Sequence, residues 1–113
     1  MRECFLAIQS ACRERRHIQA ILPAEPVGVL LEGEKQTWIL MVNQQGVDFS
    51  PDVSGKWQLR LRGKEESLAE LLAGEQQLRF QLRLGEVEMT GLYRFQLWFE
   101  SFVWLCRSYK NSA

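Results

Sequence analysis

The chain has 113 residues, of which 46% are hydrophobic and 25% are charged, and its acidic and basic side chains balance to a formal net charge of zero. This length and composition predict one globular domain that spans residues 1–113. Zero net charge provides no field to attract nucleic acid, and no apolar run reaches the roughly 18 residues of a membrane span. We therefore expect neither a nucleic-acid partner nor a transmembrane helix.

The N-terminal segment carries charge throughout. Glu3 comes early, and Arg13, Arg15 and Arg16 follow before a long apolar region could form. A signal peptide needs such an apolar region after its basic start. We expect no signal peptide and a cytoplasmic location.

The three cysteines, Cys4, Cys12 and Cys106, form no Cys-x-x-Cys pair, and the chain has one histidine. This pattern predicts neither a disulfide framework nor a zinc site, and we expect all three to be small buried hydrophobes. The alternative is a reactive thiol at Cys106, although no neighbouring base would activate it. The sequence has no catalytic set, metal cluster or phosphate-binding loop. We expect no enzyme activity, no metal and no cofactor.

The first predicted element is a helix from about Glu3 to Arg16. Its apolar residues fall at helical spacing, with Cys4 alongside, at Phe5, Ile8, Ala11 and Cys12. Basic side chains follow at its C-terminal end, at Arg13, Arg15, Arg16 and His17. Cations there suit the helix dipole and predict a solvated helix end. The alternative is a contact for a phosphate or a lipid headgroup.

The middle of the chain is predicted to form strands. Pro23 and Pro26 end the helical region, and strands are predicted at Val27–Glu32, Thr37–Val42, Val47–Phe49 and Trp57–Arg62. The run Thr37–Val42 is continuously apolar, which indicates a strand covered on both faces.

A short helix and two further strands are predicted next. Leu68, Leu71 and Leu72 indicate a helix that begins near Glu65 and Glu66 and is closed by Gly74. The segment Leu78–Leu84 alternates apolar and polar residues, which predicts a strand, and Val87 and Met89 alternate likewise between Gly85 and Gly91.

Basic residues occupy the polar positions of two of these strands, at Arg60, Arg62, Arg79 and Arg83. If the two strands pair, the four guanidinium groups gather on one sheet face and could hold a carboxylate or phosphate. The alternative is a solvated face balanced by nearby glutamates.

The last predicted helix, Leu92–Tyr109, has a wide apolar arc. One stripe includes Phe95, Trp98, Phe99 and Phe102, and a second set, Tyr93, Leu97 and Trp104 with Val103 beside it, lies well off that stripe. Such a helix is either buried on several sides or presents apolar surface to a lipid, a second copy of the chain or another protein.

These elements predict an α+β fold: a mostly antiparallel sheet of about five strands, flanked by an N-terminal helix and a long C-terminal helix. The order of Leu71-Leu72-Ala73-Gly74, Gly85–Gly91 and Leu92–Tyr109 resembles the latter half of the sterol carrier protein 2-like (SCP2) domains. The resemblance implies one SCP2-like domain whose sheet and helices enclose an apolar tunnel, with the C-terminal helix as its wall or lid.

Two functions follow as expectations. The first is binding of a lipid or another apolar small molecule in such a cavity; its candidate lining is Trp38, Trp57, Phe80, Met89, Phe95, Trp98, Phe99 and Phe102. The second is protein interaction or homodimerisation through the same aromatic helix, without a ligand. The aromatic residues could equally fill a cavity-free core, because each buries about 150–250 Å² when it packs.

Overall fold

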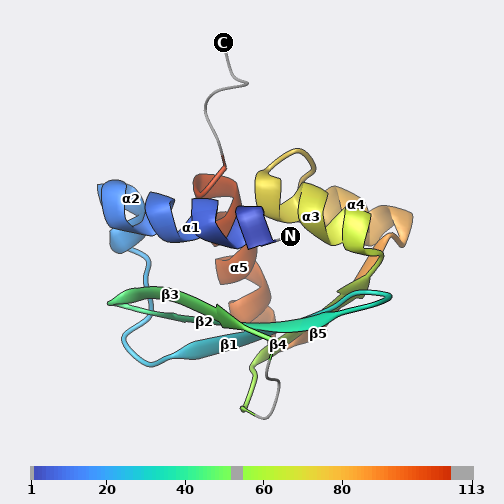
Figure 1. Ribbon diagram of the computed structural model, residues 1–113, viewed down its shortest axis with the longest axis horizontal. Helices are drawn as coiled ribbons and strands as arrows, with labels where there is room; N and C mark the ends of the chain where they lie inside the picture. Colours follow the sequence, from blue (N-terminus) through green and yellow to red (C-terminus); the bar gives the residue numbers. More distant parts are fainter. Residues whose placement is uncertain (1, 52–54, 108–113) are drawn as a thin grey trace.

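A five-stranded sheet carries its helices on one face in the computed structural model (Figure 1), which describes residues 2–51 and 55–107. The strands are β1 (Val27–Glu32), β2 (Thr37–Asn43), β3 (Gly46–Ser50), β4 (Leu59–Gly63) and β5 (Val87–Gly91). The helices are α1 (Arg2–Glu14), α2 (Arg16–Gln19), α3 (Glu65–Ala73), α4 (Leu78–Leu84) and α5 (Tyr93–Leu105). The expected α+β class and its flanking helices are confirmed. Tyr109, the predicted end of the last helix, lies outside the described residues.

The sheet is mixed, which corrects the expectation of a mostly antiparallel one. Its strand order is β3-β2-β1-β4-β5. The β1–β2, β2–β3 and β4–β5 pairs are antiparallel, whereas β1 and β4 run parallel with Val29 opposite Leu59 and Leu31 opposite Leu61. Hairpin turns join β1, β2 and β3, but β4 reaches the far side of β1 through a crossing connection, and that crossing makes the pair parallel.

The crossing passes close to the backbone at Gly28. A Cβ at this position would lie 2.6 Å from the carbonyl oxygen of Lys56, so only glycine lets the two segments approach. Two hydrogen bonds fix the approach: the Gln58 N–H donates to the Gly28 carbonyl at 2.9 Å, and the Gly28 N–H donates to Oε1 of Gln58 at 2.5 Å. This segment lies against the sheet face that carries no helices, where Ile39 is buried, as expected for a strand covered on both faces.

The helical face of the sheet is almost wholly apolar. The inward residues of the central strands, Val29, Leu31, Leu40, Leu59 and Leu61, are completely buried. They pack against the predicted stripe of α1 and against Phe99 and Phe102 of α5. The alternation of inward and outward residues along each strand therefore places the core between the sheet and the helices.

Residues Leu78–Leu84 form helix α4 and not the predicted strand. Leu78 and Gln81, three residues apart, are its buried side chains, whereas Phe80 and Leu84 are exposed. The Nε2 of the buried Gln81 donates a hydrogen bond to the Ser67 carbonyl of α3 at 2.8 Å, whereas its Oε1 has no hydrogen-bond partner among the described residues. Gly85 ends the helix in the left-handed conformation, with φ of 75°.

Candidate functional site

Helix α5 has two apolar faces, as its sequence predicted. The inner face carries Phe99 and Phe102, both completely buried, and the Phe102 ring stacks on Trp98 with centroids 5.1 Å apart. The outer face exposes Leu92, just before the helix, and Tyr93, Leu97 and Trp104. One face of the helix therefore belongs to the core, and the other is largely exposed.

The predicted cavity residues fall into three separate places. Met89, Phe95, Trp98, Phe99 and Phe102 lie in or against the core around α5. Trp38 belongs to a second aromatic cluster with Phe5 of α1 and Phe49 of β3, at centroid distances of 5.4 and 6.1 Å. Trp57, before β4, and Phe80, on α4, are exposed.

The indole N–H of Trp98 forms a hydrogen bond that holds the ring in place. Its indole Nε1–H donates to the carbonyl of Ile21, in the segment after α2, at 2.8 Å. The indole Nε1–H of the half-buried Trp38, by contrast, is itself buried and has no hydrogen-bond partner among the described residues. Burial of an indole normally requires such a partner. The two tryptophans therefore differ in whether the indole N–H is paired.

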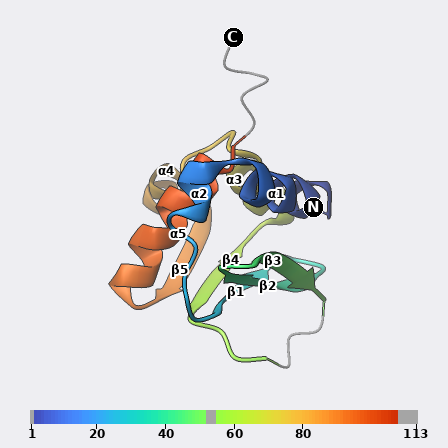
Figure 2. The same ribbon diagram turned by 90° about the vertical axis from the view of Figure 1, so that its left-hand side faces the viewer.

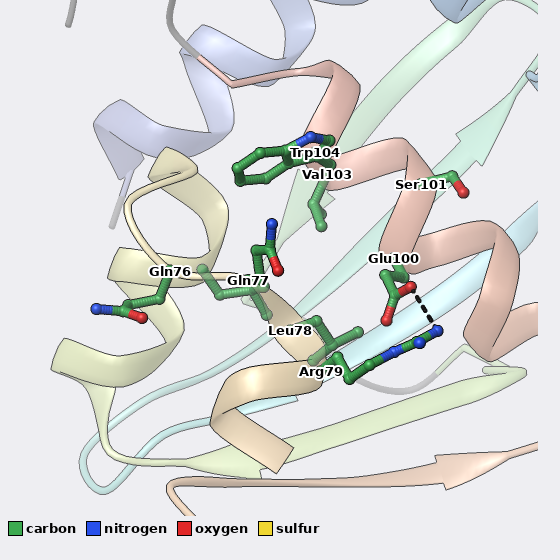
Figure 3. Close-up of a pocket in the computed structure, with 9 residues that line it drawn as sticks. Gln76, Gln77, Leu78, Arg79, Glu100, Ser101, Val103 and Trp104 are labelled. Atoms are coloured by element: carbon green, nitrogen blue, oxygen red, sulfur yellow. Dashed lines mark hydrogen bonds and ion pairs between the residues drawn. The ribbon is translucent and has the colours of Figure 1, made fainter. Parts of the chain in front are cut away.

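A pocket of about 280 Å³ lies between the outer side of α5 and the segment that joins α3 to α4 (Figure 3). We call it the α5 pocket. Its apolar lining consists of Leu71, Leu78, Val103 and Trp104. Its polar lining consists of Gln76, Gln77, Arg79, Glu100 and Ser101. Figure 3 shows Arg79 reaching toward Glu100, with which it forms an ion pair at 3.2 Å.

None of the predicted cavity residues lines the α5 pocket. Sequence reasoning missed Leu71 and Leu78, which it assigned to a helix core and to a strand. It did place Trp104 and Val103 in the second apolar set of the last helix, off the main stripe. That set was the signal for this pocket, because a helix residue outside the core stripe must face another element or solvent.

A second pocket, of about 650 Å³, has a mainly charged lining. It lies where β4, α3, α4 and β5 meet, and its charged residues are Arg62, Lys64, Glu66, Glu70, Glu86 and Glu88. Charged side chains of both signs line it and favour water over an apolar ligand. In residues 2–51 and 55–107 no group of three or more His, Cys, Asp or Glu side chains could hold a metal ion.

The predicted cluster of four arginines does not form, because Leu78–Leu84 is a helix. Arg60 of β4 pairs with Glu32 of β1, and Arg79 pairs with Glu100 of α5. The guanidinium groups on the sheet are therefore separated from those on α4, and no anion site is built between two paired strands.

Cys12 and Cys106 lie side by side in the core between the ends of α1 and α5. Contact with Cys12, and then burial, raise the pKa of the Cys106 thiol. Both side chains are buried, as expected, while Cys4 is half-buried with its Sγ 3.8 Å from the Ala69 carbonyl. A buried, protonated thiol is a poor nucleophile, which weighs against the reactive-thiol alternative for Cys106.

The basic end of the first helix has a structural use that the sequence did not indicate. Nη1 of Arg15 donates to the carbonyls of Leu105 and Arg107, at 2.7 and 2.8 Å. Leu105 is the last residue of α5, where helix carbonyls lack an intrahelical partner, and Arg107 lies two residues beyond it. Arg13, Arg16 and His17 are exposed.

The comparisons with known proteins identify the fold. A UbiJ-SCP2 ubiquinone synthesis protein superimposes with a TM-score of 0.72 at 20% identity, over 90% of each chain. The sterol carrier protein domain 2 of Helicoverpa armigera gives 0.67 at 7% identity, over 93% of this chain and 85% of that one. The sec-alkylsulfatase Pisa1 of Pseudomonas sp. gives 0.64 at 15% identity, over 80% of this chain but only 14% of the sulfatase.

No protein-family model and no curated protein matches the sequence. Within the described residues, no helix is long and apolar enough to cross a bilayer. The structural matches cover nearly the whole domain and agree on its architecture, which confirms the resemblance drawn from Leu71–Gly74, Gly85–Gly91 and the last helix. The chain has the fold of an SCP2-like domain.

Proposed function

We propose that this domain binds a lipid or another apolar small molecule, with α5 as one wall of the binding site. The observation that carries the proposal is the α5 pocket, whose apolar lining includes Trp104 and Val103 of that helix. The SCP2-like fold supports it, because proteins named as a sterol carrier and as a ubiquinone synthesis protein have the same architecture.

The pocket suits part of a chain-like ligand. Its 280 Å³ is close to the lower end of the roughly 300–1,000 Å³ that small-molecule pockets occupy. Leu71, Leu78, Val103 and Trp104 would contact methylene groups, and burial of apolar surface provides about 25 cal/mol per Å². The remainder of a long ligand would extend over the outer face of α5.

Polar groups at the rim would orient the ligand. The amides of Gln76 and Gln77 offer donors and acceptors, and Arg79 offers a cation that Glu100 already partly neutralises. A headgroup with a hydroxyl, carbonyl or carboxylate would meet partners there. This arrangement of an apolar wall with few polar groups is typical of small-molecule sites.

The residues predicted from the sequence offer a second location for the same ligand, between α5 and the sheet. Phe99 and Phe102 fill that space with completely buried rings. A ligand would have to displace α5 to enter, which is the lid role expected of this helix. Both locations share α5, but they depend on opposite faces of it.

Titration with a fluorescent fatty acid tests the proposal and separates the two locations. Trp104→Ala should raise the Kd about tenfold, since loss of about 1.4 kcal/mol of contact energy corresponds to that factor. Trp57→Ala is the matched control, because Trp57 is similarly exposed but lies outside the pocket. Its Kd should equal that of the wild type.

Three results would contradict this assignment. Absence of binding to the wild-type protein would remove the ligand-binding function. Equal Kd values for the Trp104→Ala and Trp57→Ala variants would remove the α5 pocket as its site. A Kd raised by Phe95→Ala but unchanged by Trp104→Ala would place the ligand on the inner face of α5.

A further inference from the structure

The outer surfaces of α4 and α5 expose six large apolar side chains. We call this surface the α4–α5 apolar face; its residues are Phe80, Leu84, Leu92, Tyr93, Leu97 and Trp104. Tyr93 and Leu92 are the most exposed of the six, at 69% and 60%. Grouped apolar exposure of this kind marks a surface that meets a partner.

The two helices present this surface together. Tyr93, Leu97 and Trp104 follow one another along α5 at spacings of four and seven residues, which places them on one side of the helix. The ion pair between Arg79 and Glu100 joins α4 to that side of α5, and Phe80 and Leu84, four residues apart, share one side of α4. Figure 2 shows α4, α5 and β5 on the same side of the molecule.

Cationic side chains accompany the apolar ones. Arg79, Arg83 and Arg94 are exposed, and each is adjacent in sequence to a member of the α4–α5 apolar face. Arg107 places its guanidinium 4.3 Å from the centre of the Trp104 ring. Glu100 is the one carboxylate of the two helices, and Glu86 and Glu88 belong to the charged second pocket with Arg62 and Lys64. The face is thus locally basic although the whole chain has no net charge.

The combination of apolar and basic side chains distinguishes between two possible partners for this face, a second copy of the chain and a lipid bilayer. In a symmetric dimer the same surface meets itself, so the arginines of one copy would lie against those of the other. A bilayer that contains anionic lipids offers the opposite charge to the arginines and an apolar phase to the leucines. Tyrosine and tryptophan suit the boundary between headgroups and acyl chains, where their polar atoms stay hydrated.

We propose that the α4–α5 apolar face docks on the surface of an anionic lipid bilayer. The apolar residues enter the boundary between headgroups and acyl chains, and Arg83 and Arg94 bind lipid phosphates from its rim. Neither of these two arginines forms an ion pair within the described part of the chain. Trp104 belongs both to this face and to the α5 pocket, so a docked domain would hold its pocket open toward the bilayer.

Flotation with lipid vesicles tests the docking. Wild-type protein should float with vesicles of phosphatidylcholine and phosphatidylglycerol, float less with phosphatidylcholine alone, and detach as salt is added. Replacement of Arg83 and Arg94 by Gln should weaken partitioning about fivefold for each arginine, from about 1 kcal/mol per basic residue at an anionic surface. Leu97→Ser should weaken it about tenfold or more, because a buried leucine contributes about 1.5–3 kcal/mol.

The matched controls lie on α1. Leu6→Ser removes an exposed leucine and Arg16→Gln an exposed arginine from another part of the surface, and both should float as the wild type does. Failure of the wild type to float, or equal flotation of Leu97→Ser and Leu6→Ser, would overturn the proposal. A dimer in sedimentation that Leu97→Ser dissociates would also overturn it, since the face would then be a protein interface.

The docking can be separated from ligand binding. Arg83 and Arg94 do not line the α5 pocket, and neither is among the residues of the outer face of α5 over which the ligand would extend. Their variants should therefore keep the fatty-acid affinity of the wild type while they lose flotation. Loss of fatty-acid binding together with normal flotation would reject the proposed function and leave the docking surface in place.

Discussion

Arg15 shows how one side chain can fix the position of the last helix. Its guanidinium donates hydrogen bonds to two carbonyls at the end of α5, and the Cys12–Cys106 contact lies beside it. Hydrogen bonds that involve a charged group contribute more than neutral ones, and the last carbonyls of a helix lack an intrahelical partner. We infer that Arg15 holds α5 against the end of α1.

Replacement of Arg15 by Met should lower the free energy of unfolding by about 2 kcal/mol, because it retains the aliphatic stem and removes the donors. Urea unfolding followed by circular dichroism measures this value. Arg16→Met is the control: Arg16 is exposed and its side chain donates no hydrogen bond within the described residues. Equal stabilities of the two variants would show that Arg15 is dispensable.

Sequence patterns predicted core residues well and solvent-facing residues less well. Phe5, Ile8, Ala11 and Cys12 are buried, as the stripe of the first helix indicated. Arg15 and Gln81 were assigned to solvated faces, but each makes hydrogen bonds to a distant carbonyl. Such bonds depend on which elements meet in three dimensions, and no local period contains that information.

At the scale of elements, two glycines close the short helices α3 and α4 in the same conformation. Gly74 has φ of 77° and Gly85 has φ of 75°. Their surroundings differ, because a Cβ at Gly74 would overlap the Cβ of Arg107, whereas nothing lies within 4 Å of one at Gly85. Gly74 thus serves both as a helix end and as the contact between α3 and the end of α5.

The two alanine variants should separate these roles. Gly85→Ala should cost about 1–2 kcal/mol through its backbone conformation alone. Gly74→Ala should cost about 1–3 kcal/mol more, because Arg107 must shift to admit the new methyl group. Thermal unfolding of both variants measures the difference. Identical losses would mean that the end of α5 moves aside freely.

The segment Leu78–Leu84 is the element that the sequence assigned to the wrong kind of secondary structure. Its Leu-x-Phe-x-Leu-x-Leu order fits a strand, but Leu78, Gln81 and Leu82 also lie at the spacing of three and four that a helix requires. A seven-residue segment is too short for either period to decide. Gly85 was the better signal, because a glycine directly after the last leucine commonly ends a helix.

The whole molecule combines a predictable architecture with a site that its sequence located only in part. Apart from α2 and α4, the order of helices and strands follows from local periodicity, as do the buried stripe of α5 and the two-sided burial of β2. The parallel pairing of β1 and β4 depends on a connection that crosses the sheet at Gly28. The α5 pocket likewise requires Leu71, Leu78 and Trp104 from three separate elements to converge. Long-range placement of this kind leaves no local pattern.

Native mass spectrometry tests the central claim of apolar-ligand binding most directly. The protein is purified without detergent and measured before and after equilibration with a long-chain fatty acid. A monomer that carries one ligand, identified by organic extraction, is the predicted result, and Trp104→Ala should lose that ligand at a lower collision energy than Trp57→Ala. A bare monomer or a bare dimer under both conditions would contradict the account.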